Sequence, residues 1–324
     1  MSRKQRIITV AFGAFFALLS VIAIGVFSPK NKQTYVVGFQ SNLIYLPIFV
    51  AEANGYFREF GLDVELRKFQ SASEMMRSLK LQEINFTGMS SMSVVAREQE
   101  ATPGLLKVIT LEKFSPNASP DAIVALHNAG INDLDGLKGK TLATWKGSTI
   151  KTYTKVIIES VGLNVHDLDI IDVGKVEMLE LFKLGKVDAV FTFEPYVTQI
   201  VTHNNGIIVE RAPLANRLLG SAKDIYPGGS AVLSSFEKNE SEAVKSFKAA
   251  YAKAIKYIHT NRDDAIDILA RRTSVPGSIL KNMGKMDWVV ADSIHLGAVQ
   301  ELLDLYSKHG ITEKPLDAST VLSY

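Results

Sequence analysis

The stretch SASEMMRSLKLQEINFTG, residues 71–88, contains one helix-and-strand unit and decides the fold class. Ser71 followed by Glu74 is the capping-box pattern that begins a helix. The pattern predicts a helix that continues through Leu81. The residues from Ile84 to Thr87 then form a short apolar run typical of a buried strand. Similar short apolar runs alternate with helical patterns from Thr34 onward, which predicts an α/β fold.

A second copy of this unit lies 103 residues further along the chain. Residues 74–85, EMMRSLKLQEIN, align with residues 177–188, EMLELFKLGKVD. The nearby sequence GLDV at residues 61–64 is also echoed, by GLNV at residues 162–165. Two units that recur in the same order at nearly the same offset predict two similar α/β halves.

Two turn-rich stretches bracket the second copy. They are SPNASP at residues 115–120 and YPGG at residues 226–229, and both interrupt the periodic pattern. A strand is expected next, at residues 231–234, and the chain after it is mostly helical and has no sheet of its own. We therefore expect two lobes joined by a two-strand hinge, with residues 34–118 plus 231–324 in lobe 1 and residues 119–230 in lobe 2. The helices expected after the second stretch cover residues 240–259 and 263–271, a short piece after residue 276, and residues 293–309.

The first thirty residues form a membrane-directed segment. Three basic residues precede an uncharged run of 21 residues, 7–27, and a helix of that length spans about 30 Å. The length favours an uncleaved anchor, whereas the small residues at 23 and 25 suit cleavage of a signal peptide. Basic residues stay on the cytoplasmic side, so either reading predicts export of the remainder to the periplasm. An uncleaved segment would anchor the chain to the inner membrane through this hydrophobic helix.

Composition excludes several classes of protein. The 324 residues are 47% hydrophobic and 22% charged, which is typical of a folded chain of about two domains. With 36 Lys and Arg against 34 Asp and Glu, the charge is too balanced for a nucleic-acid-binding protein. The absence of cysteine excludes disulfides, thiolate nucleophiles, iron–sulfur clusters and cysteine-based zinc sites.

Catalytic and metal-binding motifs are missing as well. The sequence GLKGKT at residues 136–141 resembles a P-loop, but Leu134 stands where the first glycine is required. The histidines do not occur at the helical spacing of a metal site, and no Gly-x-Ser-x-Gly elbow is present. We expect no catalytic residue, no metal and no cofactor.

A resemblance to one family rests on residues 51–66, AEANGYFREFGLDVEL. This stretch closely resembles the signature A-x-x-x-G-Y-F-x-x-x-G-L-D-V of the extracytoplasmic nitrate, sulfonate, taurine and thiamine-precursor binding proteins of ABC importers, the SsuA/THI5-like or NMT1 family. The sequence departs from the family at residues 82–85, QEIN, where Gly-Glu/Lys-Ile/Val-Asp is usual. Further matches in the family's order are LDGLKGKT at 134–141, GS at 147–148, GKVDA at 185–189 and EPY at 194–196.

The resemblance implies a type II periplasmic-binding-protein fold and a role as the substrate-binding component of an ABC importer. The implied partners are a small polar solute, which is a sulfonate, taurine, nitrate or a thiamine-pyrimidine-like compound, and the permease subunits of the membrane. We expect a monomer. A sensor module that presents its ligand to a membrane signalling protein is the alternative, and a lyase on the same fold is a third reading. The thiamine-pyrimidine enzymes of the family carry a cysteine-rich iron motif, which this chain lacks.

Candidate ligand-binding residues follow the predicted strands, because ligands of open α/β sheets lie beyond the carboxyl ends of strands. Each group has an ordinary structural alternative: a polar loop, helix capping by the serines, or packing of an aromatic ring at a lobe edge. The candidates are Gln40, Ser41, Asn42 and Tyr45 after the first strand; Gly88, Met89, Ser90 and Ser91 after the third; Trp145, Lys146, Gly147, Ser148 and Thr149 at a strand-to-helix junction; Glu194; and Tyr226.

The sharpest candidate is the junction at residues 145–149. The unpaired N–H groups of a helix N-terminus attract an anion without needing an arginine, although Ser148 could instead cap that helix. Glu194, with Pro195 expected at the first helical position, would hold a carboxylate at the cleft mouth or form a salt bridge to the other lobe. Because these loops contain no arginine and Glu194 faces the same space, we expect a zwitterion or a polar heterocycle more than a bare multivalent anion.

Overall fold

The structure is a computed structural model that describes residues 33–294 and 296–323. The segment of residues 1–30 lies outside the described residues, and so do the hydrophobic helix and the cleavage site expected there. Over the part of the chain that is described, no helix has the length and apolar character needed to cross a membrane.

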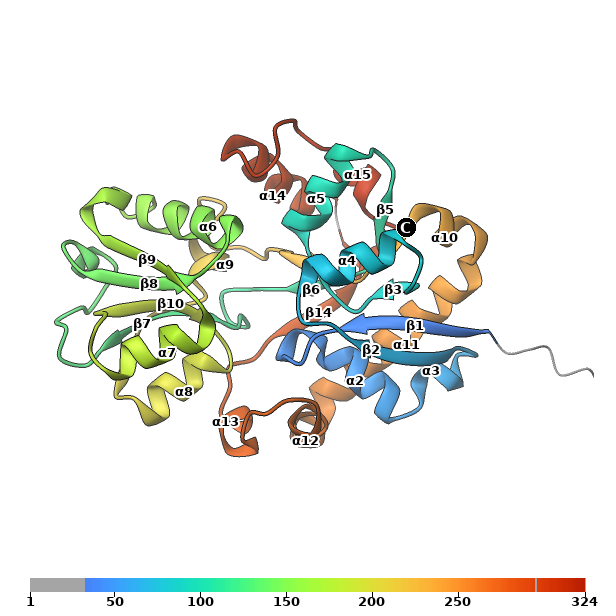
Figure 1. The fold of residues 1–324 in the computed structure, drawn as a ribbon, viewed down its shortest axis with the longest axis horizontal. Coiled ribbons are helices and arrows are strands. Elements are labelled where there is room, and N and C mark those ends of the chain that lie inside the picture. Colours follow the sequence, from blue (N-terminus) through green and yellow to red (C-terminus); the bar gives the residue numbers. More distant parts are fainter. Residues whose placement is uncertain (1–32, 295, 324) are drawn as a thin grey trace, which may run out of the picture. The chain divides into compact units, whose positions relative to one another are not determined.

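One α/β body, here called the three-stranded unit, contains the sheet β2-β1-β3. Strands β1 and β3 run parallel, with Val37 opposite Phe86. Figure 1 shows this unit on the right, with α2, α3 and α11 beside its strands. Its first elements are β1 (Thr34–Phe39), η1 (Leu43–Tyr45), α2 (Leu46–Ala53), α3 (Tyr56–Glu59), β2 (Asp63–Lys68), α4 (Ala72–Lys80), β3 (Phe86–Thr87), β4 (Ser90–Ser91), α5 (Met92–Ala101), β5 (Leu106–Val108) and β6 (Thr110–Lys113).

The five-stranded unit follows, on the left of Figure 1, with the strand order β11-β7-β10-β8-β9. Strand β8 lies between β10 and β9 and is parallel to both, whereas β7 is antiparallel to its two neighbours. Its elements are β7 (Asp121–Leu126), η2 (Asp135–Leu137), β8 (Thr141–Trp145), α6 (Ser148–Glu159), η3 (Val165–Asp167), β9 (Asp169–Val173), α7 (Lys175–Lys183), β10 (Ala189–Phe193), α8 (Tyr196–His203), β11 (Gly206–Arg211) and α9 (Pro213–Arg217).

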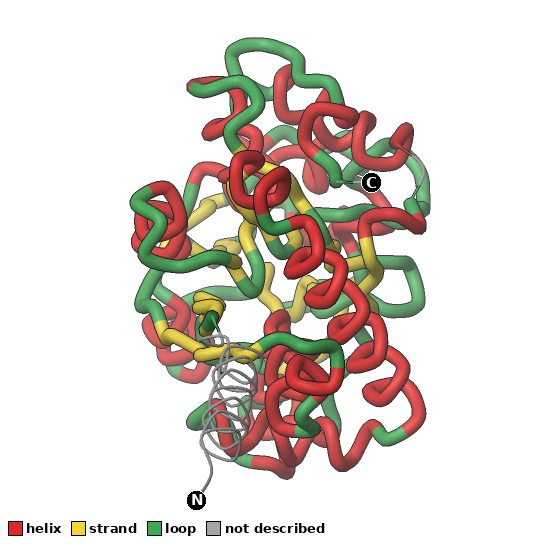
Figure 2. The backbone as a smooth tube through the Cα atoms, turned by 90° about the vertical axis from the view of Figure 1, so that its right-hand side faces the viewer, coloured by secondary structure: helices red, strands yellow, loops and turns green. Residues whose placement is uncertain are grey.

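The chain then returns to the three-stranded unit. Each of the returning strands pairs with a strand from the first pass: β12 with β4, β13 with β5 and β14 with β6. In Figure 2, seen from the right-hand side of Figure 1, helices lie in front of much of the strand region. The returning elements are β12 (Gly228–Gly229), β13 (Ala231–Leu233), α10 (Ser234–Asn239), α11 (Ser241–Thr260), α12 (Arg262–Arg272), α13 (Gly277–Lys281), β14 (Asp287–Val290), η4 (Ala291–Ser293), α14 (Leu296–Lys308) and α15 (Ala318–Val321).

Two crossovers connect the units, one after β6 and one before β12. They lie side by side, because Phe114 and Ile225 exchange backbone hydrogen bonds, with N···O distances of 3.0 and 2.9 Å. The paired residues immediately precede the two stretches that the sequence marks as interruptions.

The sequence repeat corresponds to a repeat of structure. Helix α4 precedes β3 and helix α7 precedes β10, and both helices begin and end at positions 103 residues apart. Strand β3 lies beside β1 and strand β10 lies beside β8, so the order β2-β1-β3 matches the order β9-β8-β10, and β10 additionally pairs with β7. Gly61 and Gly162 both have left-handed backbones, with φ of 83° and 81°, a conformation that glycine adopts without strain.

Aromatic side chains join the long helix α11 to the first sheet. Phe247 of α11 stacks on Phe86 of β3, with ring centroids 4.5 Å apart and the ring planes 6° apart. Phe57 of α3 packs against the same helix, 5.5 Å from Phe247. All three side chains are buried, and each contributes roughly 1.5–3 kcal/mol of transfer free energy. The returning helix therefore completes the core of a sheet built from the start of the chain.

Candidate ligand-binding site

A cavity of about 950 Å³ is lined by residues from both units. This volume suits an organic molecule, since ligand sites in proteins span roughly 300–1,000 Å³. The predicted residues that line it are Gln40, Ser41, Asn42, Met89, Ser91, Trp145, Lys146, Gly147, Ser148, Thr149 and Glu194.

Four predicted residues are absent from the lining: Tyr45, Gly88, Ser90 and Tyr226. Tyr45 is buried, and its hydroxyl donates to the Met89 carbonyl at 3.1 Å. A side chain at Gly88 would meet the Gly38 carbonyl oxygen at 2.8 Å, so this glycine allows two strands to approach.

The other two also serve the fold. Ser90 donates to Thr87 Oγ1 at 3.1 Å, within a buried polar pair. Tyr226 is buried beside the second crossover. Tyr45 and Tyr226 thus take the packing role that was their structural alternative, whereas Ser90 does not cap a helix.

The N-terminus of α6 opens on the cavity. Gly147, with φ of 147°, is the N-cap and Ser148 is the first helical residue, so Ser148 does not cap the helix. Its Oγ accepts a hydrogen bond from Arg97 Nη1 at 3.2 Å. Thr149 Oγ1 accepts from Arg97 Nη2 at 3.4 Å and donates to Ser93 Oγ at 2.8 Å. These bonds join α6 of the five-stranded unit to α5 of the three-stranded unit.

Basic side chains from distant parts of the chain gather at this cavity. The predicted loops themselves contain no arginine, but two helices outside them deliver three arginines to the cavity. Arg97 lies on α5, six residues beyond the predicted Ser91. The basic residues of the lining are Lys68, Arg97, Lys146, Lys175, Arg271 and Arg272.

Lys175 and Trp145 form a cation–π pair at the cavity wall. The Lys175 Nζ lies 4.3 Å from the centroid of the Trp145 ring, and burial lowers the pKa of this amine. The ring also packs on Phe193, with centroids 4.8 Å apart. The indole Nε1 is covered and has no hydrogen-bond partner among the described residues. Trp145 therefore binds the Lys175 ammonium through its ring, and its indole N–H is available as a hydrogen-bond donor.

The Glu194 carboxylate is fixed within the structure. Its side chain is 1% exposed and accepts hydrogen bonds from Thr198 N, Thr198 Oγ1 and Gly284 N, all at 3.0 Å. Pro195 is the N-cap of α8, not its first helical residue as expected. The salt bridge to the other lobe that was the alternative role of Glu194 is not found among the described residues, because the cation near it is Arg211, 4.0 Å away in the same unit. Its contact with the other unit is the hydrogen bond from Gly284 N.

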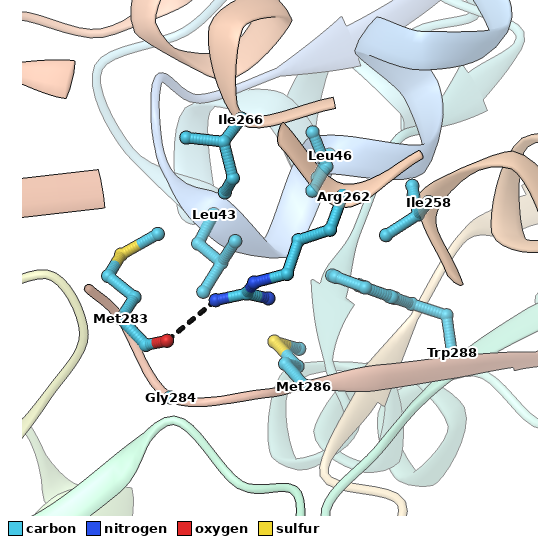
Figure 3. Close-up of a pocket in the computed structure, with 9 residues that line it drawn as sticks. All are labelled: Leu43, Leu46, Ile258, Arg262, Ile266, Met283, Gly284, Met286 and Trp288. Carbon is cyan, nitrogen blue, oxygen red and sulfur yellow. Dashed lines mark hydrogen bonds between the residues drawn. The ribbon is translucent and has the colours of Figure 1, made fainter. Parts of the chain in front are cut away.

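A second, much smaller cavity lies beside the segment that contains Gly284 (Figure 3). Arg262 reaches between apolar side chains, and its Nη2 donates to the Met283 carbonyl at 2.6 Å. The cavity has about 10 Å³, room for one water at most. Arg262 on one side and Glu194 on the other thus hold the chain at residues 283–284.

Comparison with known proteins identifies the family. The family described as "NMT1/THI5 like" matches residues 42–265, more than half of the chain. The chain belongs to the NMT1/THI5-like family. A Bacillus subtilis protein named "Putative aliphatic sulfonates-binding protein" is 27% identical to this chain, over 90% of this chain and 86% of its own length. The crystal structure of the Escherichia coli periplasmic aliphatic sulphonate binding protein SsuA has a TM-score of 0.73 at 16% identity and covers 90% of this chain and 97% of its own.

These likenesses establish the α/β periplasmic-binding-protein fold for this NMT1/THI5-like chain. One relative is an enzyme by name, the yeast 4-amino-5-hydroxymethyl-2-methylpyrimidine phosphate synthase THI13, which is 24% identical over 49% of the chain and 45% of its own length. The relatives named above that match over most of the chain are binding proteins by name.

Proposed function

We propose that the chain is the extracytoplasmic substrate-binding component of an ABC importer and that its ligand is an organic anion of the sulfonate class. The observation that carries the proposal is the charge of the cavity wall. Lys68, Lys146 and Arg271 have no ion-pair partner among the described residues, whereas Arg272 pairs with Glu52. The two acidic residues of the wall, Glu112 and Glu194, are both buried. An anion would therefore find cations without a competing free carboxylate.

The size of the cavity favours an organic anion over a small inorganic one. Nitrate would fill a small part of 950 Å³, and the wall also contains apolar side chains such as Phe114, Leu280 and Met283. An alkyl or aryl group could cover these side chains while a sulfonate meets the basic residues. The sulfonate specificity of relatives, as their names state it, agrees with this division of the wall.

We further propose that the two units act as lobes, with residues 34–118 plus 231–324 in one and residues 119–230 in the other. The paired crossovers at Phe114 and Ile225 would be the hinge. Contacts across the cavity support closure around a ligand, namely those from Arg97 to Ser148 and Thr149.

The partners and the location belong to the same proposal. The chain would work as a monomer in the periplasm and deliver its ligand to permease subunits, and residues 7–27 would tether it to the inner membrane if they are not removed. No relative supports the sensor alternative.

Calorimetric titration tests the function. We expect the full chain to bind pentane-1-sulfonate and to bind neither pentan-1-ol nor pentylammonium, which share the alkyl group but carry no anion. Arg97→Met should weaken sulfonate binding at least tenfold, because a charge-assisted hydrogen-bond donor is lost. Arg77→Met, at an exposed arginine of α4 outside the cavity, is the matched control and should bind like the wild type. Equal affinity for the alcohol, or no affinity for any organic sulfonate, would refute the proposal.

A further inference from the structure

Glu112 is a buried carboxyl on the cavity wall that the proposed function does not use. It lies on β6, just before the first crossover, is 4% exposed and lines the cavity. Its Oε2 is fully covered and has no hydrogen-bond partner among the described residues. No cation of the described chain forms an ion pair with it, so nothing in its surroundings supports a negative charge.

The groups around Glu112 are neutral. The titratable side chains that face it are four tyrosines, one each from η1, α6, α11 and α14, and burial raises the pKa of every one. Trp288 of β14 is its partner across the strand pair. Gly228 of β12 leaves room for the carboxyl, because a Cβ there would lie 2.6 Å from Glu112 Oε1. The tyrosines are Tyr45, Tyr153, Tyr251 and Tyr306.

Such surroundings favour the protonated acid. Burial raises the pKa of Glu112 to about 8, so the carboxyl is mostly neutral at pH 7. A neutral carboxyl carries one O–H donor, and a buried donor is costly when it has no acceptor.

Glu112 shares the cavity wall with Arg97 and Tyr153. The hydroxyls of Tyr153 and Tyr306 lie 2.6 Å apart, and Tyr153 lines the cavity. The pKa of Tyr306 is raised mainly by burial, and among smaller effects Glu112 raises it and Arg97 lowers it. Glu112 and Arg97 therefore both act on one hydroxyl and both belong to the cavity wall, so one ligand in the cavity has both side chains in its surroundings.

We propose that Glu112 binds the ligand as a neutral acid, with its O–H donating a hydrogen bond to an oxygen of the anion that the basic residues hold. This inference rests on the proposed function, because it requires an anionic ligand. The neutral acid supplies a hydrogen-bond donor at a buried position. A lysine or arginine at this position would place an unpaired charge there. Loss of the proton would turn this donor into a negative group that repels the ligand, so Glu112 makes binding depend on pH.

The test compares the affinity of the full chain for pentane-1-sulfonate at pH 6 and pH 9. Above a pKa of about 8 the protonated fraction falls about tenfold per pH unit, so we expect roughly tenfold weaker binding at pH 9. Glu112→Gln keeps an N–H donor and cannot ionise. Its affinity at pH 6 should stay within about threefold of the wild type and should change little at pH 9.

Lys175 is the other cavity group whose pKa is shifted toward this range, so Lys175→Arg is the control. Arginine stays charged at pH 9, and the pH dependence should persist in that variant. A flat profile in wild type and Lys175→Arg would overturn the inference even if Glu112→Gln failed to fold. An unchanged pH dependence in Glu112→Gln would overturn it as well. So would a tenfold loss at pH 6 in a folded Glu112→Gln, since the carboxylate would then be serving a ligand cation. A wild-type chain that binds no sulfonate at either pH would refute the proposed function and this inference with it.

Discussion

At the scale of single residues, two buried carboxyls on one cavity wall differ in the hydrogen-bond donors around them. Glu194 accepts three hydrogen bonds at 3.0 Å, from Thr198 and Gly284. The Oε2 of Glu112 is covered and has no hydrogen-bond partner in the described chain, and burial raises the pKa of this carboxyl to about 8. One glutamate, Glu194, thus anchors a contact between the units, whereas the other, Glu112, is a group that titrates.

The raised pKa of Glu112 leads to a prediction for the stability of the ligand-free chain. Its pKa is raised in the folded chain above the value of 4.5 for a free side chain, so its contribution to stability is complete below pH 4.5 and is lost as the pH rises through 8. Within this window the loss approaches about 1.4 kcal/mol per pH unit. Relative to wild type, Glu112→Gln should therefore gain in free energy of unfolding between pH 5 and pH 8, as measured by urea unfolding.

Glu180→Gln, at an exposed glutamate of α7, serves as the control and should show no such gain. A constant difference between Glu112→Gln and wild type across that pH range would mean that Glu112 is already ionised in the folded chain.

At the scale of elements, the sequence predicted what depends on local pattern. Helices α4 and α7 and the strands that follow them were expected from a repeat of short segments, and capping at Ser71 is present, with its Oγ 3.1 Å from Glu74 N. Strand β14 was missed because its four residues pair only with β6, far away in the sequence.

The arginines of the cavity escaped prediction for the same physical reason. Arg97 and Arg271 lie on helices whose own sequences do not show what they face, and only the packing of α5 and α12 brings them to the wall. The loops after β1 and β8, by contrast, were predicted to belong to one ligand site because each follows the carboxyl end of a strand, and both line one cavity.

The N-terminus of α6 permits a test in which stability and binding respond in opposite directions. Ser148→Asp should weaken pentane-1-sulfonate binding at least tenfold, because the new carboxylate would occupy Arg97 and repel the anion. An acidic residue in the first turn of a helix is favourable by about 0.3–1 kcal/mol, so the melting temperature should hold or rise.

Ser148→Ala is the matched variant. It removes only the hydrogen bond from Arg97 Nη1 and should change binding by a few-fold at most. If Ser148→Asp left the affinity for sulfonate unchanged, α6 would not belong to the ligand site.

At the scale of the whole molecule, contacts between the units tie the proposed function to motion. The Tyr153 and Tyr306 hydroxyls meet at 2.6 Å, and Gly284 N donates to Glu194 at 3.0 Å, each pair joining the two units. A ligand favours the closed arrangement only through contacts that the open one lacks. Small-angle scattering should therefore show the radius of gyration falling when pentane-1-sulfonate saturates the chain, and an unchanged radius at saturation would refute the two-lobe mechanism.

The N-terminal segment gives a separate prediction. Removal of residues 1–30 should leave a soluble, folded monomer, because the described residues after position 34 contain two clusters of buried hydrophobic side chains. Analytical ultracentrifugation would measure this. Aggregation of the shortened chain at every salt concentration would mean that the segment is part of the fold.

The return of the chain to the three-stranded unit also sets the order in which its parts become available during synthesis. The five-stranded unit is one continuous stretch of the chain. Strand β5, however, has its edge completed by residues more than 200 positions later: Leu322 bridges to Val108, and Ser323 N donates to the Val108 carbonyl at 3.0 Å. The three-stranded unit can therefore complete its folding only after the whole five-stranded unit has been synthesised.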